Sequence, residues 1–325
     1  MTDPGEAELQ ERATRRMLLF MSVDMENSTR LKQSPSSGQN HWLTVIENFI
    51  EEFPKLFNAH RGRLQREHTL AELPEPKLWK VLGDELVFLS EVSTGEHLTC
   101  LMEAFRGTLE ESNAKTRDHA KSPPSAESLR LPVKGTAWVA GFPVTNAAIL
   151  TDRGSDYVGP AMDLGFRLSK LATPQRLALS VDLAWLLTCF DSRLRFHFEG
   201  RLDLRGVSEG VGYPFIWAEV SPSLYQDKED ALLGRASSPA SLHELCTHFI
   251  LEHGVPGYLP FLKHEPLATR PPLGYEKDYA QVVEALRKKL FHEPADSPAP
   301  AANIAGWQYD TLKALEQQLK GGQSY

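Results

Sequence analysis

The stretch LWKVLGDELVFL, residues 78–89, contains two apolar runs separated by Gly83, Asp84 and Glu85. A glycine and acidic residues between two strand-like runs are typical of a tight hairpin, so the stretch predicts two antiparallel strands of one sheet. A solvent-exposed surface turn is the plain alternative, and it requires only a glycine and a polar residue. The two carboxylates at the tip acquire a function only if the rest of the chain supplies a partner for them.

Length and composition limit what kind of protein this is. A chain of 325 residues with 41% hydrophobic residues can bury a sizeable core, as one large domain or as a main domain with an extension. The net charge of -8 argues against broad attraction to nucleic acid. Three distant cysteines fit a reducing compartment better than a disulfide scaffold. The apolar run Met17–Val23 is too short to cross a membrane, so we expect a soluble cytoplasmic protein that binds neither nucleic acid nor membrane.

Strand-like and helix-like patterns alternate along the first 222 residues. Strands are expected at 17–23, 129–141, 176–181, 195–206 and 213–220 in addition to the hairpin, and helices after residue 26 and at 42–57, 97–111, 160–171 and 184–188. Loops are expected at 114–128 and from 142 to 156. This mixture indicates an α+β sandwich in which helices cover one mainly antiparallel sheet.

The character of the sequence changes after residue 222. Short helical patterns separated by proline-rich connections predict a helical extension over 223–325, whose role we leave open between packing, dimer contact and partner binding. One of these patterns carries His243, Cys246, His248 and His253. A zinc site is the alternative here, but His248 lies well round the helix from His243 and Cys246, so an amphipathic helix with incidental histidines is favoured.

Asp24 gives the hairpin tip a candidate partner. It directly follows the apolar strand at 17–23, and Asp84 would reach the same end of a shared sheet. Two carboxylates held together repel each other unless a cation lies between them, and hard carboxylate oxygens select Mg²⁺ or Mn²⁺. The run Asn27-Ser28-Thr29 places small polar side chains at a helix start, where anions are favoured. Together these features predict a metal and triphosphate site, although the sequence has no P-loop.

Four segments in order resemble motifs of the class III nucleotidyl cyclases. They are FMSVDMENSTRL from Phe20, KVLGDELVF from Lys80, SDYVGPAMDLGFRLSKLA from Ser155, and LDLRGV from Leu202. They look like the first metal loop, the hairpin that carries the second metal acid, the dimer arm with its helix, and a late strand that ends in a basic residue and glycine. The resemblance covers about residues 15–220, so we interpret residues 1–222 as a class III cyclase-like catalytic domain.

The resemblance implies a head-to-tail homodimer with composite active sites. Asp24 and Asp84 would bind two divalent metal ions, Mn²⁺ or Mg²⁺, together with the backbone carbonyl of Met25. Arg167 of the partner subunit would stabilise the phosphorus under attack by the ribose 3′-hydroxyl. The residues implied to grip the triphosphate are Asn27, Ser28, Thr29 and Arg205.

Two positions depart from the family pattern. The family usually has an asparagine four residues before the arginine, where it orients the ribose, and this chain has Asp163. The first loop usually reads Gly-Phe-Thr, and here it reads Asn-Ser-Thr. Asp163 is the best support for the alternative that the domain binds nucleotide without turning it over.

The choice of nucleotide rests on conflicting signals. Lys80 and Asp156 stand at the two base-reading positions of the family, where this pair implies adenine. The compact loop VDMENST resembles more closely the Pycsar cyclases, which make cyclic UMP or cyclic CMP in bacterial antiphage defence and act through a separate effector. We therefore place UTP first, CTP second and ATP close behind. A pyrimidine pocket needs bulk, for which Trp79, Trp138 and Tyr157 are candidates, with core packing as their alternative role.

Overall fold

The structure is a computed structural model that describes residues 4–33, 39–119, 131–152, 154–190, 192–204, 206–207, 212–234, 238–253 and 274–291. Its strands are β1 (Arg16–Met25), β2 (Lys77–Leu82), β3 (Glu85–Glu91), β4 (Val133–Phe142), β5 (Ala147–Thr151), β6 (Gly154–Val158), β7 (Arg176–Leu179), β8 (Phe196–Leu202) and β9 (Tyr213–Glu219). Its helices are α1 (Pro4–Ala13), α2 (Ser28–Gln33), α3 (Gln39–Glu67), α4 (Gly95–His119), α5 (Pro160–Leu168), the short 3-10 turn η2 (Ser169–Leu171), α6 (Val181–Cys189), α7 (Leu224–Leu233), α8 (Pro239–His253) and α9 (Tyr275–Leu290).

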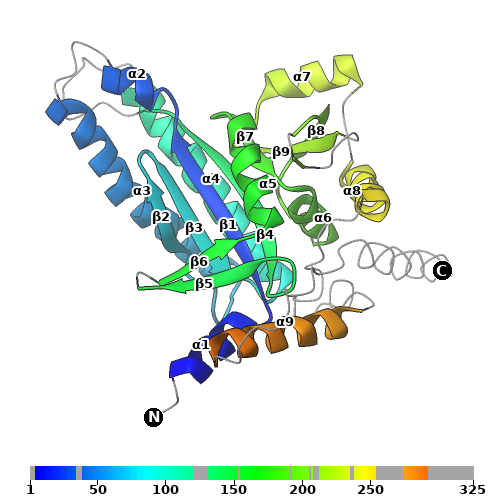
Figure 1. Cartoon of the computed structure of the whole chain (residues 1–325). Coiled ribbons are helices and arrows are strands. Elements are labelled where there is room, and N and C mark those ends of the chain that lie inside the picture. The colour runs from blue at the N-terminus through cyan, green and yellow to red at the C-terminus, as the bar shows by residue number, and fades with distance from the viewer. Residues whose placement is uncertain are drawn as a thin grey trace.

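One seven-stranded sheet organises the chain, in the order β2-β3-β1-β4-β7-β9-β8. Every neighbouring pair is antiparallel except β4 and β7, which run parallel. Strands β5 and β6 form a separate two-stranded hairpin. Helices pack on this sheet, so the α+β class with one mainly antiparallel sheet is confirmed (Figure 1).

Strand β1 lies inside the sheet, between β3 and β4, where its residues are apolar on both faces. Leu19 and Met21 belong to a large buried cluster with residues of α3, α4 and α6, whereas Leu18 and Phe20 belong to a second cluster on the opposite face. Since successive side chains of a strand point to opposite faces, the even-numbered residues of β1 share the second face.

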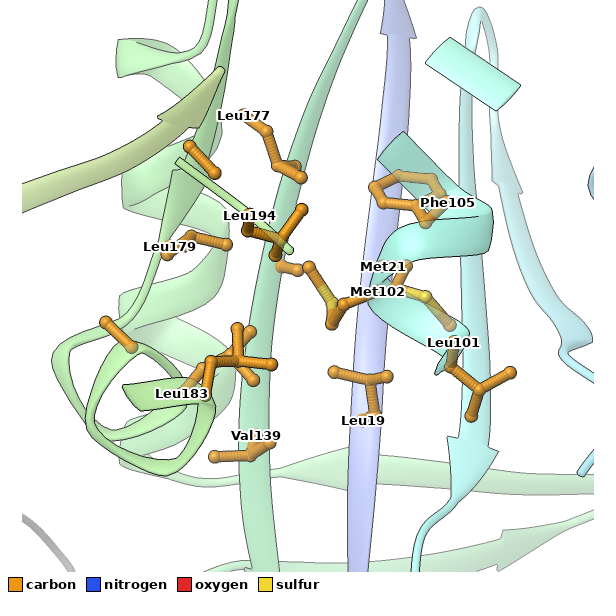
Figure 2. Close-up of a cluster of buried hydrophobic side chains, with 14 of the residues drawn as sticks. Leu19, Met21, Leu101, Met102, Phe105, Val139, Leu177, Leu179, Leu183 and Leu194 are labelled. Atoms are coloured by element: carbon orange, nitrogen blue, oxygen red, sulfur yellow. The ribbon is translucent and has the colours of Figure 1, made fainter. Parts of the chain in front are cut away.

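Helix α4 supplies much of the larger cluster. Figure 2 shows Leu101, Met102 and Phe105 of this helix directed toward side chains of β1 and β4, among them Leu19 and Val139. All five side chains are fully buried. Complete burial of large apolar side chains on this side makes the sheet and its helices a single core.

The β5–β6 hairpin and α5 lie on the other face, where the hairpin crosses in front of the sheet in Figure 1. Asn146 joins them, because its Oδ1 atom accepts a hydrogen bond of 3.1 Å from the backbone N–H of Ala161. Gly159, just before the helix, has φ of 142°, and a Cβ atom there would lie 2.9 Å from the Cα atom of Asn146. Only glycine fits this junction, which therefore fixes the start of α5.

The three helices that the structure describes after position 222 each contact the rest of the chain, α7 by ion pairs to Arg195 and His197. Trp185 of α6 donates a hydrogen bond of 2.9 Å to the Thr247 hydroxyl of α8, and the buried apolar residues of α8 belong to the larger cluster. Helix α9 lies beside α1 (Figure 1), where Arg15 makes two hydrogen bonds to Glu276 of 2.7 and 2.5 Å. The boundary at residue 222 remains a prediction.

Several elements differ from the sequence-based expectation. Helix α3 is longer at both ends than the predicted 42–57 and continues through Pro54, because Phe53 and Phe57 are buried in the core on either side of the proline. The region 142–156, expected to be a loop, contains β5 and the start of β6, and α1 was not expected. Within the described part of the chain, no helix is long and apolar enough to span a membrane.

Candidate active site

The hairpin and the central strand bring Asp24 and Asp84 together. Asp24 lies near the end of β1, directly opposite Glu85, the first residue of β3. Asp84 precedes it in a turn that Gly83 enters with a positive φ of 75°. The backbone N–H of Met25 donates to the carbonyl of Asp84 at 3.3 Å, which ties the end of β1 to the turn. The expectation that both acids reach one end of the sheet therefore agrees with the geometry.

A lysine accompanies each of the two acids. Lys134, opposite Asp24 on β4, places its Nζ atom 3.2 Å from Asp24 Oδ2. Lys32 of α2 places its Nζ atom 3.0 Å from Asp84 Oδ1, and the Ser28 hydroxyl donates a hydrogen bond to Asp84 Oδ2. The side chains in both ion pairs are between 22% and 32% exposed, so solvent still reaches the site.

The electrostatic environments of the two acids differ. Burial raises the pKa of Asp24 above the ordinary value, Lys134 opposes the rise, and the nearby Asp84 carboxylate adds to it. Burial also acts to raise the pKa of Asp84, but hydrogen bonds from Ser28 and Lys32 outweigh it, and the pKa is lowered. The repulsion expected between paired carboxylates therefore raises the pKa of Asp24, whereas the pKa of Asp84 stays low.

Polar residues continue from this pair over the same face of the sheet. Residues Ser22 and Asp24 share the face of Phe20, and their partners on β4 are Thr136 and Lys134. Glu85 accepts a hydrogen bond of 2.5 Å from the Ser22 hydroxyl. Burial raises the pKa of Glu85, Ser22 opposes the rise, and Asp24 adds to it. The end of this face therefore carries three carboxylates and a lysine where the rest of it is apolar.

The donor set fits a hard divalent cation in its chemistry. Asp24 and Asp84 offer carboxylate oxygens, and the backbone of Met25 adjoins both of them. Among the described residues, no group of three or more carboxylate, histidine or cysteine side chains converges closely enough to hold a metal ion alone. A metal at this site would take its remaining ligands from water and phosphate oxygens, as Mg²⁺ commonly does.

Asn27, Ser28 and Thr29, the expected phosphate-binding residues at the start of α2, differ in their exposure to solvent. The helix begins at Ser28, and the Asn27 carbonyl accepts the Leu31 N–H at 3.1 Å. Asn27 and Thr29 are exposed, whereas Ser28 is buried and its hydroxyl is directed to Asp84. The Ser28 hydroxyl therefore supports an acid of the pair, and phosphate binding by Asn27, Ser28 and Thr29 stays a prediction.

The two expected base-reading residues contact each other. Lys80 Nζ on β2 lies 2.7 Å from Asp156 Oδ1 on β6, with side chains 34% and 40% exposed. The ammonium group also lies 4.4 Å from the centre of the Trp79 ring. The Trp79 indole N–H donates to the Ser155 carbonyl at 3.0 Å, which holds β2 against β6. The ion pair places a positive and a negative group side by side on an accessible surface.

Trp138 and Tyr157 both pack in the core. Trp138 is fully buried and stacks on Phe20 with ring centres 5.4 Å apart. The Tyr157 ring packs against Phe20 and Phe142 at 5.7 and 5.1 Å. The proposal of bulk in the base pocket is therefore wrong for Trp138, because a fully buried ring cannot touch a ligand. Trp79, at the edge of this cluster, remains a candidate.

Helix α5 carries the expected catalytic residues. The Arg167 guanidinium donates to the backbone carbonyl of Asp163 at 2.9 Å, and the Asp163 side chain is exposed. A Cβ atom added to Gly206 would lie 3.5 Å from Arg167 Nη2, so the late loop after β8 adjoins this arginine. Arg205 lies outside the described residues.

His243, Cys246 and His248, the members of the α8 set whose side chains the structure describes, do not converge. Cys246 is buried in the core, and burial raises the pKa of its thiol to about 12. His243 stacks on Trp185 with ring centres 5.3 Å apart, and His248 is exposed. The placement of His253's side chain lies outside the described part. These positions fit the amphipathic helix that the sequence favours.

Sequence reasoning missed Lys32 and Lys134 and assigned no role to Glu85. Lys134 becomes visible once the pairing of β1 with β4 is known, because the register sets it opposite Asp24. Lys32 lies one helical turn after Ser28, so both side chains reach Asp84 from one face of α2.

No protein-family model and no curated protein matches the sequence. Among solved structures, the adenylyl cyclase CyaB from P. aeruginosa overlaps with a TM-score of 0.47 at 11% identity, over 65% of this chain and 97% of that one. The guanylyl cyclase Cya2 overlaps with a TM-score of 0.41 at 15% identity, over 66% of this chain and 96% of that one. The catalytic core of a rhodopsin-guanylyl cyclase with converted specificity, in complex with ATPαS, overlaps with a TM-score of 0.43 at 11% identity. The overlap covers 63% of this chain and 95% of that one. Overlaps at these scores establish no shared activity, and the function proposed below rests on the chain's own residues.

Proposed function

We propose that this chain is a nucleotidyl cyclase, which converts a nucleoside triphosphate into a 3′,5′-cyclic nucleotide and pyrophosphate. The observation that carries the proposal is the meeting of Asp24 and Asp84 at one end of the sheet, beside the polar start of α2. The motifs that contain these residues follow the order seen in class III cyclases. A partly exposed acidic pair next to small polar groups suits a metal-bound triphosphate.

The proposed reaction is an internal displacement at phosphorus. The ribose 3′ oxygen attacks the α-phosphorus, the bond from that phosphorus to the oxygen leading to the β-phosphate breaks, and the 3′-hydroxyl proton is lost. Asp24, Asp84 and the carbonyl of Met25 would hold Mg²⁺ or Mn²⁺ ions, two in the arrangement that the resemblance implies. When bound, these ions would lower the pKa of the 3′-hydroxyl and neutralise the leaving pyrophosphate.

The remaining residues would bind and position the substrate. The triphosphate is proposed to contact Asn27, Ser28, Thr29 and Arg205, and Arg167 to stabilise the charge that develops on the phosphorus. Asp163 would orient the ribose hydroxyls in place of the usual asparagine. Catalysis of this kind comes from position and charge, with no covalent intermediate on the protein.

A homodimer with composite sites is part of the proposal. Apolar side chains on β2 and on the β5–β6 hairpin are 40% to 46% exposed, a pattern that supports coverage by a second copy. They are Leu78, Val81, Leu82, Ile149 and Val158. In this dimer, Arg167 and Asp163 of one subunit would serve the acidic pair of the other. Gel filtration with light scattering would test the oligomeric state, and a monomer at the concentrations of the activity assay would contradict the homodimer.

UTP is the substrate that we propose from the sequence, because the first loop resembles that of the Pycsar cyclases. The product, cyclic UMP, would act in the cytoplasm as a second messenger of antiphage defence, sensed by a separate effector. CTP is the next candidate on the same grounds. ATP has one specific observation in its favour, which is the Lys80–Asp156 ion pair at the positions where class III cyclases read adenine.

The test is product formation by the purified protein with each of the four nucleoside triphosphates and Mn²⁺, analysed by chromatography. We expect one predominant cyclic nucleotide, and exclusive cyclic AMP would refute the uridylate assignment. Metal-dependent nucleotide binding without turnover would favour the non-catalytic alternative. Absence of both binding and turnover would refute the cyclase proposal.

Variants of the acidic pair connect the activity to the site. Asp24→Asn and Asp84→Asn should abolish product formation. Asp24→Asn should leave thermal stability nearly unchanged, because burial opposes the charge of this carboxylate and its ion pair with Lys134 is partly exposed. Asp84→Asn should cost at most about 1 kcal/mol, since it weakens a partly exposed ion pair. Glu91→Gln, at the far end of β3, is the matched control, and full activity in either site variant would remove the metal-ligand role.

A further inference from the structure

Asp24 and Asp84, the two acids that the proposed function assigns to the metal, each form an ion pair with a lysine. Lys32 lies 3.0 Å from Asp84 Oδ1, and Lys134 lies 3.2 Å from Asp24 Oδ2. The lysines come from α2 and β4, so each acid receives a positive charge from a different element. The acidic pair is therefore already neutralised by the protein itself.

Asp84 is the more fully engaged of the two acids. Its Oδ2 atom accepts the Ser28 hydroxyl while its Oδ1 atom accepts from Lys32. Both interactions lower the pKa of Asp84, which means that they stabilise its charged form. A cation that coordinates this carboxylate must displace or share these contacts, and it then lies close to a fixed positive charge.

We propose that Lys32 and Lys134 act as internal counter-ions which hold the acidic pair in the metal-free protein and compete with the divalent ion for it. Binding of the metal releases both ammonium groups. The triphosphate of the substrate, which brings several negative charges to the same place, is the acceptor for these groups. Metal and nucleotide therefore bind cooperatively, with weak metal binding when nucleotide is absent.

The charges set the size of the effect. Two unit charges 4 Å apart in water interact by about 1 kcal/mol, or about sixfold in affinity, and a divalent ion doubles the energy. Solvent reaches both lysines, whose side chains are 32% and 23% exposed, so screening keeps the effect near its value in water. Removal of one ammonium group should tighten metal binding on the order of tenfold. The larger change is expected at Lys32, because its acid has both oxygens engaged.

The roles of the two lysines are those of positioning residues. They fix the side-chain directions of Asp24 and Asp84 before the metal arrives, and contact with the reacting phosphorus is not required of them. A positional role of this kind changes metal affinity and its dependence on nucleotide, whereas a purely structural role changes only stability.

The experiment measures binding of Mn²⁺ alone to the full chain by titration calorimetry and by the loss of the free Mn²⁺ electron paramagnetic resonance signal. Lys32→Met and Lys134→Met remove the charge while keeping most of the side-chain length. Lys32→Arg keeps the charge. Lys228→Met, an exposed lysine on α7, is the matched control. Each titration is repeated with a non-hydrolysable nucleoside triphosphate analogue present.

We expect about tenfold tighter Mn²⁺ binding for Lys32→Met without nucleotide, a smaller gain for Lys134→Met, and unchanged binding for Lys32→Arg and Lys228→Met. The enhancement of Mn²⁺ affinity by the analogue should shrink in the Lys32→Met variant by the same factor. Thermal unfolding of each variant checks that the fold is kept.

Unchanged or weaker Mn²⁺ binding in both methionine variants would overturn the inference, as would failure of every variant to bind Mn²⁺. The inference rests on the proposed function, but the two fail separately. A wild-type protein that makes a cyclic nucleotide while its lysine variants bind Mn²⁺ no more tightly refutes the counter-ion role alone. A protein without product in which Lys32→Met still tightens Mn²⁺ binding refutes the cyclase activity alone.

Discussion

The substitution Gly165→Ala tests whether the position of α5 governs the proposed chemistry. Gly165 lies between Asp163 and Arg167 on this helix and faces Trp138. A Cβ atom at this position would lie 2.7 Å from Trp138 Cε3 and closer still to Cδ2 and Cε2. Carbon atoms pack at about 3.5 to 4.0 Å, so the helix and the indole must separate by about 1 Å.

The indole cannot absorb this shift. Trp138 is fully buried and stacks almost parallel on Phe20, with an angle of 7° between the rings. The helix must therefore move, and Asp163 and Arg167 move with it. Overpacking of this kind costs about 1 to 3 kcal/mol of stability. A misplacement of about 1 Å at a catalytic group lowers the rate on the order of 10²-fold.

Gly62→Ala is the matched control, because Gly62 also lies within a helix. A Cβ atom there would contact only the Arg66 guanidinium, at 3.6 Å. This change should raise stability by about 0.4 to 1 kcal/mol and leave the rate unchanged. The assays are urea unfolding and cyclic nucleotide formation. Wild-type stability and rate in Gly165→Ala would refute the packing argument, and a loss of stability with a normal rate would show that α5 does not position the reacting groups.

Two further predictions concern a buried acid and the base pocket. Asp182 of α6 is buried, and burial raises its pKa from 3.8 to about 6 against opposing hydrogen bonds from Ser180 and Leu183, so the folded state disfavours the charged form. The folded pKa exceeds the unfolded one, so stability falls as pH rises from about 4 to above 6, by about 3 kcal/mol in total. Asp182→Asn should recover most of the lost stability at about pH 8 and none below about pH 4, as measured by urea unfolding. An equal change in stability at both pH values would contradict burial of the Asp182 charge as the cause. Trp79→Ala should raise the rate with ATP relative to UTP by about tenfold if this ring fills the space of a purine. Trp79→Phe serves where the alanine variant unfolds, and an unchanged ratio in a folded variant would exclude Trp79 as the source of base selection.

The central sheet was predictable because its strands carry strong local patterns. The apolar run in β1 and the Gly83 turn between β2 and β3 each indicate a strand or hairpin from neighbouring residues alone. The arrival of Asp24 and Asp84 at one sheet end follows from the same elements. The limits of α3 were not predictable, because tertiary burial of Phe53 and Phe57 overrides the local preference of Pro54 to end a helix.

The contacts that neutralise the acids were not predictable, because they depend on strand register and helix placement. Lys134 lies far from Asp24 in sequence, and only the pairing of β1 with β4 sets it opposite the acid. The burial of Trp138 also depends on a distant partner, Phe20, and on the close approach of α5. Sequence patterns indicate which face of a strand is apolar, but they do not indicate which neighbour covers it.

Base selection illustrates the same limit at the level of chemistry. Lys80 donates hydrogen bonds and Asp156 accepts them, so the pair offers one donor and one acceptor. Adenine and cytosine each present an amino donor beside a ring-nitrogen acceptor, and uracil presents an N–H donor beside a carbonyl acceptor. The resemblance assigns this pair to adenine, but one donor beside one acceptor would also complement a pyrimidine. We expect the space beside the pair to contribute to the choice, because the centre of the Trp79 ring lies 4.4 Å from the Lys80 ammonium group. Lys80 and Asp156 alone therefore do not specify the nucleotide, and the Trp79 variants test whether the size of the side chain at position 79 does.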